Sequence, residues 1–162
     1  MKTQPLDEHK ILYQLIGEWT IEAHAVMTPG EPARKLKGVE NVRSLGGVWV
    51  IAESKSEMPD GSEASMIMTL GYDPRKKRYV GTWIGTMMNH LWQYDGEMDA
   101  AGNMLTLYAE GPDLTFEGEI AKYKDIIEFE SPDLRVLTSF VQDPEGAWQR
   151  LMTTYYRRRK QF

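Results

Sequence analysis

The sequence predicts a mainly β protein, an antiparallel β-barrel of about ten strands preceded by one short helix. Only one segment has a helical period, and it is followed by many short alternating runs that turn sequences separate roughly every 8–12 residues. One helix cannot cover a large sheet, and closing the sheet into a barrel removes its exposed edges. The length of 162 residues suits one domain, so we expect residues 1–162 to form a single barrel domain.

The predicted helix covers residues 6–15. Apolar residues recur there at helical spacing, Pro5 precedes the segment, and Asp7 and Glu8 suit the first turn. Gly17 ends the segment, so the helix is expected to stop just before the first strand.

The predicted strands begin with Glu18–Ala25, where Trp19, Ile21, Ala23 and Ala25 share one face. The breaker Thr28-Pro29-Gly30-Glu31-Pro32 follows it. The remaining expected strands are 35–45, 48–58, 63–72, 78–88, 90–98, 103–111, 114–121, 124–131, 134–142 and 147–157.

Gly17-Glu18-Trp19 stands between the helix and the first strand, and it resembles the lipocalin Gly-x-Trp signature. In that superfamily the tryptophan closes the barrel floor and a basic residue of the last strand stacks on it. Arg157 or Arg158, or Arg159 beside them, would supply that cation here. The resemblance implies structural roles for Gly17, Trp19, Arg157 and Arg158.

The whole chain also resembles the bacterial calycin-like family called domain of unknown function 1579. The resemblance rests on short motifs spread along the chain: Glu8-His9, Leu15-Ile16-Gly17-Glu18-Trp19, Ser44-Leu45-Gly46-Gly47, Met68-Thr69-Leu70-Gly71-Tyr72-Asp73, Tyr79-Val80-Gly81-Thr82-Trp83-Ile84, Tyr94-Asp95-Gly96 and Tyr156-Arg157-Arg158. It implies a lipocalin-like barrel and no particular reaction. The related nitrobindins bind haem through a late-strand histidine, and the segment Leu134 to Arg159 contains none, so no cofactor is expected.

Composition narrows the partners. The net charge of −5 argues against nucleic acid and against an anionic membrane surface. No cysteine occurs, and Glu8-His9 lacks the second histidine of a zinc-protease motif because position 12 is Leu12, so no metal site is expected. No signal peptide or membrane-spanning run of apolar residues is visible, which predicts a soluble, cytoplasmic protein.

The candidate ligand site follows from an excess of methionine and tryptophan, ten and five residues, which concentrate between Met66 and Trp92. Alternation puts Met88, His90, Trp92 and Tyr94 on one side, and it places Trp83 in the opposite register unless a bulge intervenes. The sequence therefore predicts an interior cavity for a small apolar or amphipathic molecule. Its expected contacts are His90, Trp92, Tyr94, Met88, Met66, Met68 and Trp83.

Two alternatives stay open beside this non-catalytic binder. One is a barrel isomerase or hydrolase that uses His90 with a carboxylate. The other is an interaction module with a filled barrel whose exposed strands form a homodimer. The paired carboxylates Glu117 and Glu119, and Glu128 and Glu130, are expected to face solvent, because a buried charge is costly without a partner.

Overall fold

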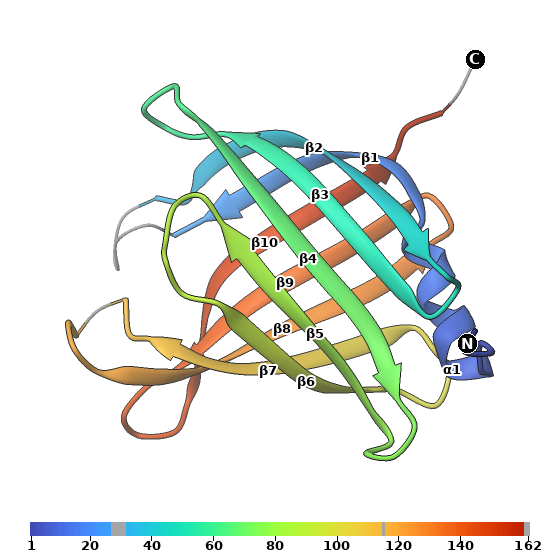
Figure 1. The fold of residues 1–162 in the computed structure, drawn as a ribbon. Coiled ribbons are helices and arrows are strands. Elements are labelled where there is room, and N and C mark those ends of the chain that lie inside the picture. The colour runs from blue at the N-terminus through green and yellow to red at the C-terminus, as the bar shows by residue number, and fades with distance from the viewer. Residues whose placement is uncertain (27–31, 115, 161–162) are drawn as a thin grey trace.

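A computed structural model describes residues 1–26, 32–114 and 116–160. Over these residues, ten antiparallel strands follow one another around a closed barrel, and β1 pairs with β10 to complete it (Figure 1). The strands are β1 Gly17–Ala25, β2 Arg34–Leu45, β3 Trp49–Glu57, β4 Glu63–Asp73, β5 Arg78–Gly85, β6 Trp92–Met98, β7 Met104–Pro112, β8 Ile120–Ser131, β9 Leu134–Gln142 and β10 Trp148–Arg158. The predicted fold class is confirmed.

The strands bury alternate residues, which is why the sequence pattern has a period of two. In β7, Leu105 and Leu107 are fully buried and Ala109 nearly so, while the residues between them are more exposed. Trp92, Tyr94 and Gly96 do the same in β6. The inward-facing side chains of the strands fill the end of the barrel near the N-terminal helices and line a cavity toward the other end.

Two short helices close one end of the barrel. They are α1 (Asp7–Ile11) and the 3₁₀-helix η1 (Leu12–Leu15), so the predicted helix over 6–15 changes hydrogen-bonding pattern halfway (Figure 1). Leu12 and Leu15 are buried in the core, and the Tyr79 hydroxyl donates a hydrogen bond of 2.9 Å to the Glu8 carbonyl. The apolar face of the helical segment therefore acts as the barrel floor.

Trp19 lies above this floor with 1% of its surface exposed. Its indole N–H donates to the Leu15 carbonyl at 2.8 Å. The guanidinium of Arg158 lies 4.2 Å from the ring centroid, and that of Arg135 from β9 lies 4.5 Å away. Arg157 does not take this place: its side chain is exposed and lies near Tyr155 and Glu22, because alternation points it out of the barrel.

Gly17 has a φ of +134°, and a Cβ there would lie 2.4 Å from Nη1 of Arg158. Glycine is thus required where the chain turns from η1 into β1 and the arginine passes close to the backbone.

One predicted strand was wrong. Of the described residues in 114–121, only Ile120 and Ala121 belong to a strand, and they begin β8, which continues to Ser131. Residues 28–31 of the predicted breaker at 28–32 lie outside the described residues. No helix in the described part of the chain is long and apolar enough to cross a membrane.

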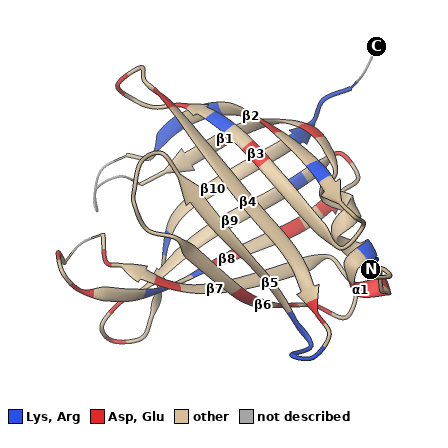
Figure 2. Ribbon diagram, viewed as in Figure 1, with Lys and Arg blue, Asp and Glu red and all other residues tan. Residues whose placement is uncertain are grey.

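Charged residues are scattered over many strands and both ends of the barrel (Figure 2). The carboxylates Glu117, Glu119 and Glu130 are exposed and Glu128 is half-buried.

Candidate functional site

The half of the barrel farther from α1 contains a cavity of about 340 Å³. Its walls come from β1 through β6 and from β8, β9 and β10, and the loops at the end opposite α1 surround its mouth (Figure 1). Apolar and aromatic side chains dominate the lining. The polar lining residues are Glu40, Ser54, Ser56, Tyr94, Tyr123, Asp125, Ser139, Thr154 and Tyr156.

The cavity wall contains six of the seven residues that the sequence singled out as ligand contacts. They are Met66, Met68, Trp83, Met88, Trp92 and Tyr94. Trp83 and Trp92 are register partners in neighbouring strands, so both point inward. The expected opposite register of Trp83 was wrong because the connection 86–91 resets the alternation between β5 and β6. Contact of these residues with a ligand stays a prediction.

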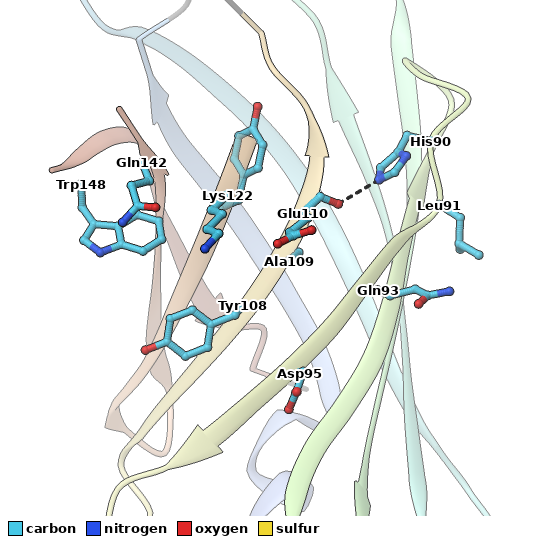
Figure 3. Close-up of a pocket in the computed structure, with 11 residues that line it drawn as sticks. His90, Leu91, Gln93, Asp95, Tyr108, Ala109, Glu110, Lys122, Gln142 and Trp148 are labelled. Atoms are coloured by element: carbon cyan, nitrogen blue, oxygen red, sulfur yellow. Dashed lines mark hydrogen bonds between the residues drawn. The ribbon is translucent and has the colours of Figure 1, made fainter. Parts of the chain in front are cut away.

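His90 is the exception, because it lies beside an outer groove rather than the cavity (Figure 3). It precedes β6, its Nε2 donates to the Glu110 carbonyl at 3.2 Å, and its ring meets that of Trp92 edge-on at 4.7 Å. Among the described hydrogen bonds and ion pairs, none joins His90 to a carboxylate. The acid–base pair considered from the sequence is therefore not formed there.

Sequence reasoning missed Asp125, which points from β8 into the cavity. The Tyr94 hydroxyl donates a hydrogen bond of 2.7 Å to its Oδ2, and the Ser139 hydroxyl also bonds to it. Burial raises the pKa of Asp125, and it also raises that of Tyr94 well above the ordinary value. The only signal in the sequence was a charged residue at an inward position of an alternating strand.

A second pair of inward-pointing polar side chains lies closer to the barrel floor than Tyr94 and Asp125 do. Glu40 of β2 accepts a hydrogen bond from Arg135 of β9, and both residues are buried. Arg135 also lies 3.9 Å from the Tyr156 ring, so Tyr156 and Trp19 both contact the guanidinium. Burial raises the pKa of Glu40, although Arg135 favours its charged form. This pair separates the cavity from the packed floor.

The wall is weakest between β6 and β7. These strands pair only from Asp95–Met98 to Leu105–Tyr108, and toward the mouth they are not paired. The Trp92 ring takes the place of the missing ladder by packing against Gly111 and meeting the Tyr123 ring edge-on at 4.9 Å. Tyr123 lines both the cavity and the outer groove, so it stands between them.

The mouth has an apolar rim. Met87 and Leu114 line the cavity, are exposed, and belong to the loops after β5 and β7. An apolar molecule that enters the cavity would first contact these side chains.

The described residues contain no group of three histidine, cysteine, aspartate or glutamate side chains placed to hold a metal ion. His9 is buried in α1, where the Leu6 backbone N–H donates to its Nδ1, and His24 contacts Glu22 at 3.2 Å.

Solved structures with a similar fold include three barrels of low sequence identity. The S-type phycobiliprotein lyase CPES from Guillardia theta has a TM-score of 0.60 and 13% identity, over 98% of this chain and 100% of that one. Rv2717c from M. tuberculosis has a TM-score of 0.68 and 12% identity, over 97% and 100%. EF1p2_mFAP2b bound to DFHBI has a TM-score of 0.51 and 10% identity, over 94% and 100%. These likenesses concern the fold.

No curated protein matches the sequence. The family described as "Protein of unknown function (DUF1579)" matches residues 4–158, nearly the whole chain, in agreement with the motifs quoted above. The chain therefore belongs to the DUF1579 family.

Proposed function

We propose that this protein is a non-catalytic binding protein that holds a small apolar or amphipathic molecule inside its barrel. The observation that carries the proposal is the cavity of about 340 Å³, which falls within the usual size of small-molecule sites. A filled barrel would have favoured the interaction module instead.

The lining supports an apolar or amphipathic ligand. Met66, Met68 and Met88 offer flexible, polarisable surface that adapts to different shapes. Trp83 and Trp92 offer large flat surfaces on adjacent strands. A few hydroxyl and carboxyl groups deeper in the cavity would orient the ligand's polar end.

The exposed apolar side chains at the mouth supply a route of entry for such a ligand. The similarly folded EF1p2_mFAP2b is bound to DFHBI in its structure, which is compatible with a ligand in a barrel of this kind. The cytoplasmic location expected from the sequence is part of the same proposal.

A titration with the neutral, environment-sensitive dye Nile red tests the proposal. We expect saturable binding that quenches tryptophan emission, because Trp83 and Trp92 lie in the wall. Phenylbutanol, which lacks a charge, should displace the dye in the same assay.

The control uses two substitutions on β1. Ala23→Phe adds bulk inside the cavity, whereas Thr20→Phe adds the same ring on the exposed side of the strand. We expect Ala23→Phe to weaken Nile red binding at least about tenfold and Thr20→Phe to leave it unchanged, with circular dichroism confirming that both variants fold. Equal binding by both variants, or no saturable binding by the unaltered protein, would refute interior binding.

A further inference from the structure

The charged residues of the cavity lining are all acidic. The lining includes two carboxylates, Glu40 and Asp125, and no lysine, arginine or histidine among its described residues. Glu40 is neutralised by Arg135, which approaches it from below the cavity. Asp125 takes part in none of the ion pairs between described residues. One inward carboxylate is therefore left without a cation.

We propose that the cavity selects amphipathic ligands carrying an ammonium or another cationic hydrogen-bond donor, and that Asp125 receives this group. The inference rests on the proposed function, because it requires the ligand to lie inside the barrel. The apolar part of the ligand then lies toward the mouth, among Met66, Met87 and Met88.

Asp125 is held ready for such a contact. The hydroxyls of Tyr94 and Ser139 donate to it from β6 and β9, which fixes the carboxylate but adds no positive charge. A carboxylate accepts more hydrogen bonds than these two hydroxyls supply, so capacity remains for a ligand N–H. A cation in this low-dielectric site would also recover the cost of burying the charge.

Other groups in the wall favour a cation as well. The rings of Trp83, Trp92 and Tyr94 line the same cavity, and aromatic rings attract an ammonium group.

The competing reading is an anionic ligand held by Arg135, whose Nη1 has no hydrogen-bond partner among the described residues. Its positive charge is already matched by Glu40, and its flat faces contact Trp19 and Tyr156. Arg135 lines a separate space of about 20 Å³ near the floor, which has room for a water molecule but not for a ligand head group. We therefore assign the head-group site to Asp125.

The test compares three probes of one shape: phenylbutylamine, phenylbutanol and phenylbutyrate, each displacing Nile red at neutral pH. We expect the amine to bind at least about tenfold tighter than the alcohol, which is the scale of a hydrogen bond to a charged partner, and the carboxylate to bind weakest. Asp125→Asn should remove the amine's advantage while the alcohol still binds. Asp95→Asn, a matched charge change on the outer face of β6, should preserve it.

The outcomes separate the two proposals. If Nile red and all three probes fail to bind, interior binding itself is wrong. If the three probes bind equally, the cation site is wrong and interior binding stands. If Asp95→Asn abolishes the preference as strongly as Asp125→Asn, the cation site is wrong and the amine binds in the outer groove that Asp95 lines. Tightest binding of phenylbutyrate would transfer the head-group site to Arg135. Should Asp125→Asn fail to fold, the ranking of the three probes on the unaltered protein still decides the charge preference.

Discussion

Asp125, which we propose receives the ligand head group, illustrates how such a residue can lower the stability of the free protein. Burial raises its pKa above the ordinary 3.8, so ionisation is less favourable in the folded than in the unfolded chain. The free-energy cost of holding an ionised Asp125 in the folded chain is therefore present at pH values above the raised pKa. It disappears as the pH falls through that pKa toward 3.8. We expect Asp125→Asn to raise the free energy of unfolding at neutral pH and to lose that gain in acid. Urea unfolding of both proteins across this pH range measures it, and a gain that is absent or independent of pH would contradict it.

Trp19 is the residue on which the barrel floor depends. Its ring is buried between two guanidinium groups and its N–H is bonded to Leu15. We expect Trp19→Ala to lower the free energy of unfolding by about 3–5 kcal/mol, the usual cost of deleting a large buried aromatic side chain. Trp49→Ala is the control, because that ring is 40% exposed on the outer face. Equal losses in chemical denaturation would show that Trp19 has no special role.

At the scale of elements, the last strand fastens the helical floor. Arg158 donates from its guanidinium nitrogens to the carbonyls of Ile16 at 2.6 Å, Gln14 at 3.0 Å and Pro132 at 3.0 Å. Lysine keeps the charge but cannot reach three directions at once. We expect Arg158→Lys to destabilise the fold by about 1–3 kcal/mol and the exposed Arg157→Lys to change it little, as measured by thermal unfolding. A larger effect at position 157 would overturn this assignment.

The edge between β6 and β7 depends on side-chain packing where the ladder is missing. A Cβ on Gly111 would lie 2.4 Å from the Trp92 ring and 3.0 Å from Nε2 of His90, so both side chains must move in Gly111→Ala. We expect a red shift of tryptophan emission and faster hydrogen exchange of amides at 92–94 and 109–111 than in the unaltered protein. Gly61→Ala, which meets nothing within 4 Å, controls for substituting a glycine, although its φ of +85° adds local strain. Unchanged emission and exchange in Gly111→Ala would show that Trp92 does not seal this edge.

Most of the strands were predictable, because a strand with one buried face has alternating apolar and polar residues in its sequence. Residues 134–142 were predicted with the bounds of β9, and most other strands with bounds one or two residues away. The failure at 114–121 has a local cause. Leu114, Phe116 and Ile120 alternate like a strand, yet all three side chains are exposed, so their pattern does not mark a face that packs into the core.

For the molecule as a whole, the sequence indicated an interior cavity but not the charged groups that line it. The excess of Met and Trp correctly indicated residues of the cavity wall, because a small filled barrel needs fewer large apolar side chains than this chain has. The meeting of Tyr94 with Asp125, and of Glu40 with Arg135, depends on closure of the barrel, which brings together residues 31 and 95 positions apart. His90 attracted attention as the one histidine in an aromatic run, but its place before β6 puts it outside.

Ligand binding should also stabilise the entire barrel, because the cavity wall includes residues from nine of the ten strands. A ligand that binds only the folded state at about one hundred times its Kd adds about 2.7 kcal/mol. For a chain of this size that stabilisation raises Tm by roughly 5–11 °C. Each further tenfold increase in ligand concentration stabilises the folded state by about 1.4 kcal/mol more. We expect phenylbutylamine to produce this concentration-dependent rise in a calorimetric scan of the unaltered protein and a much smaller one in Ala23→Phe. A rise of equal size in both proteins would place the binding on the outer surface, most simply in the groove beside His90, and would count against a ligand inside the barrel.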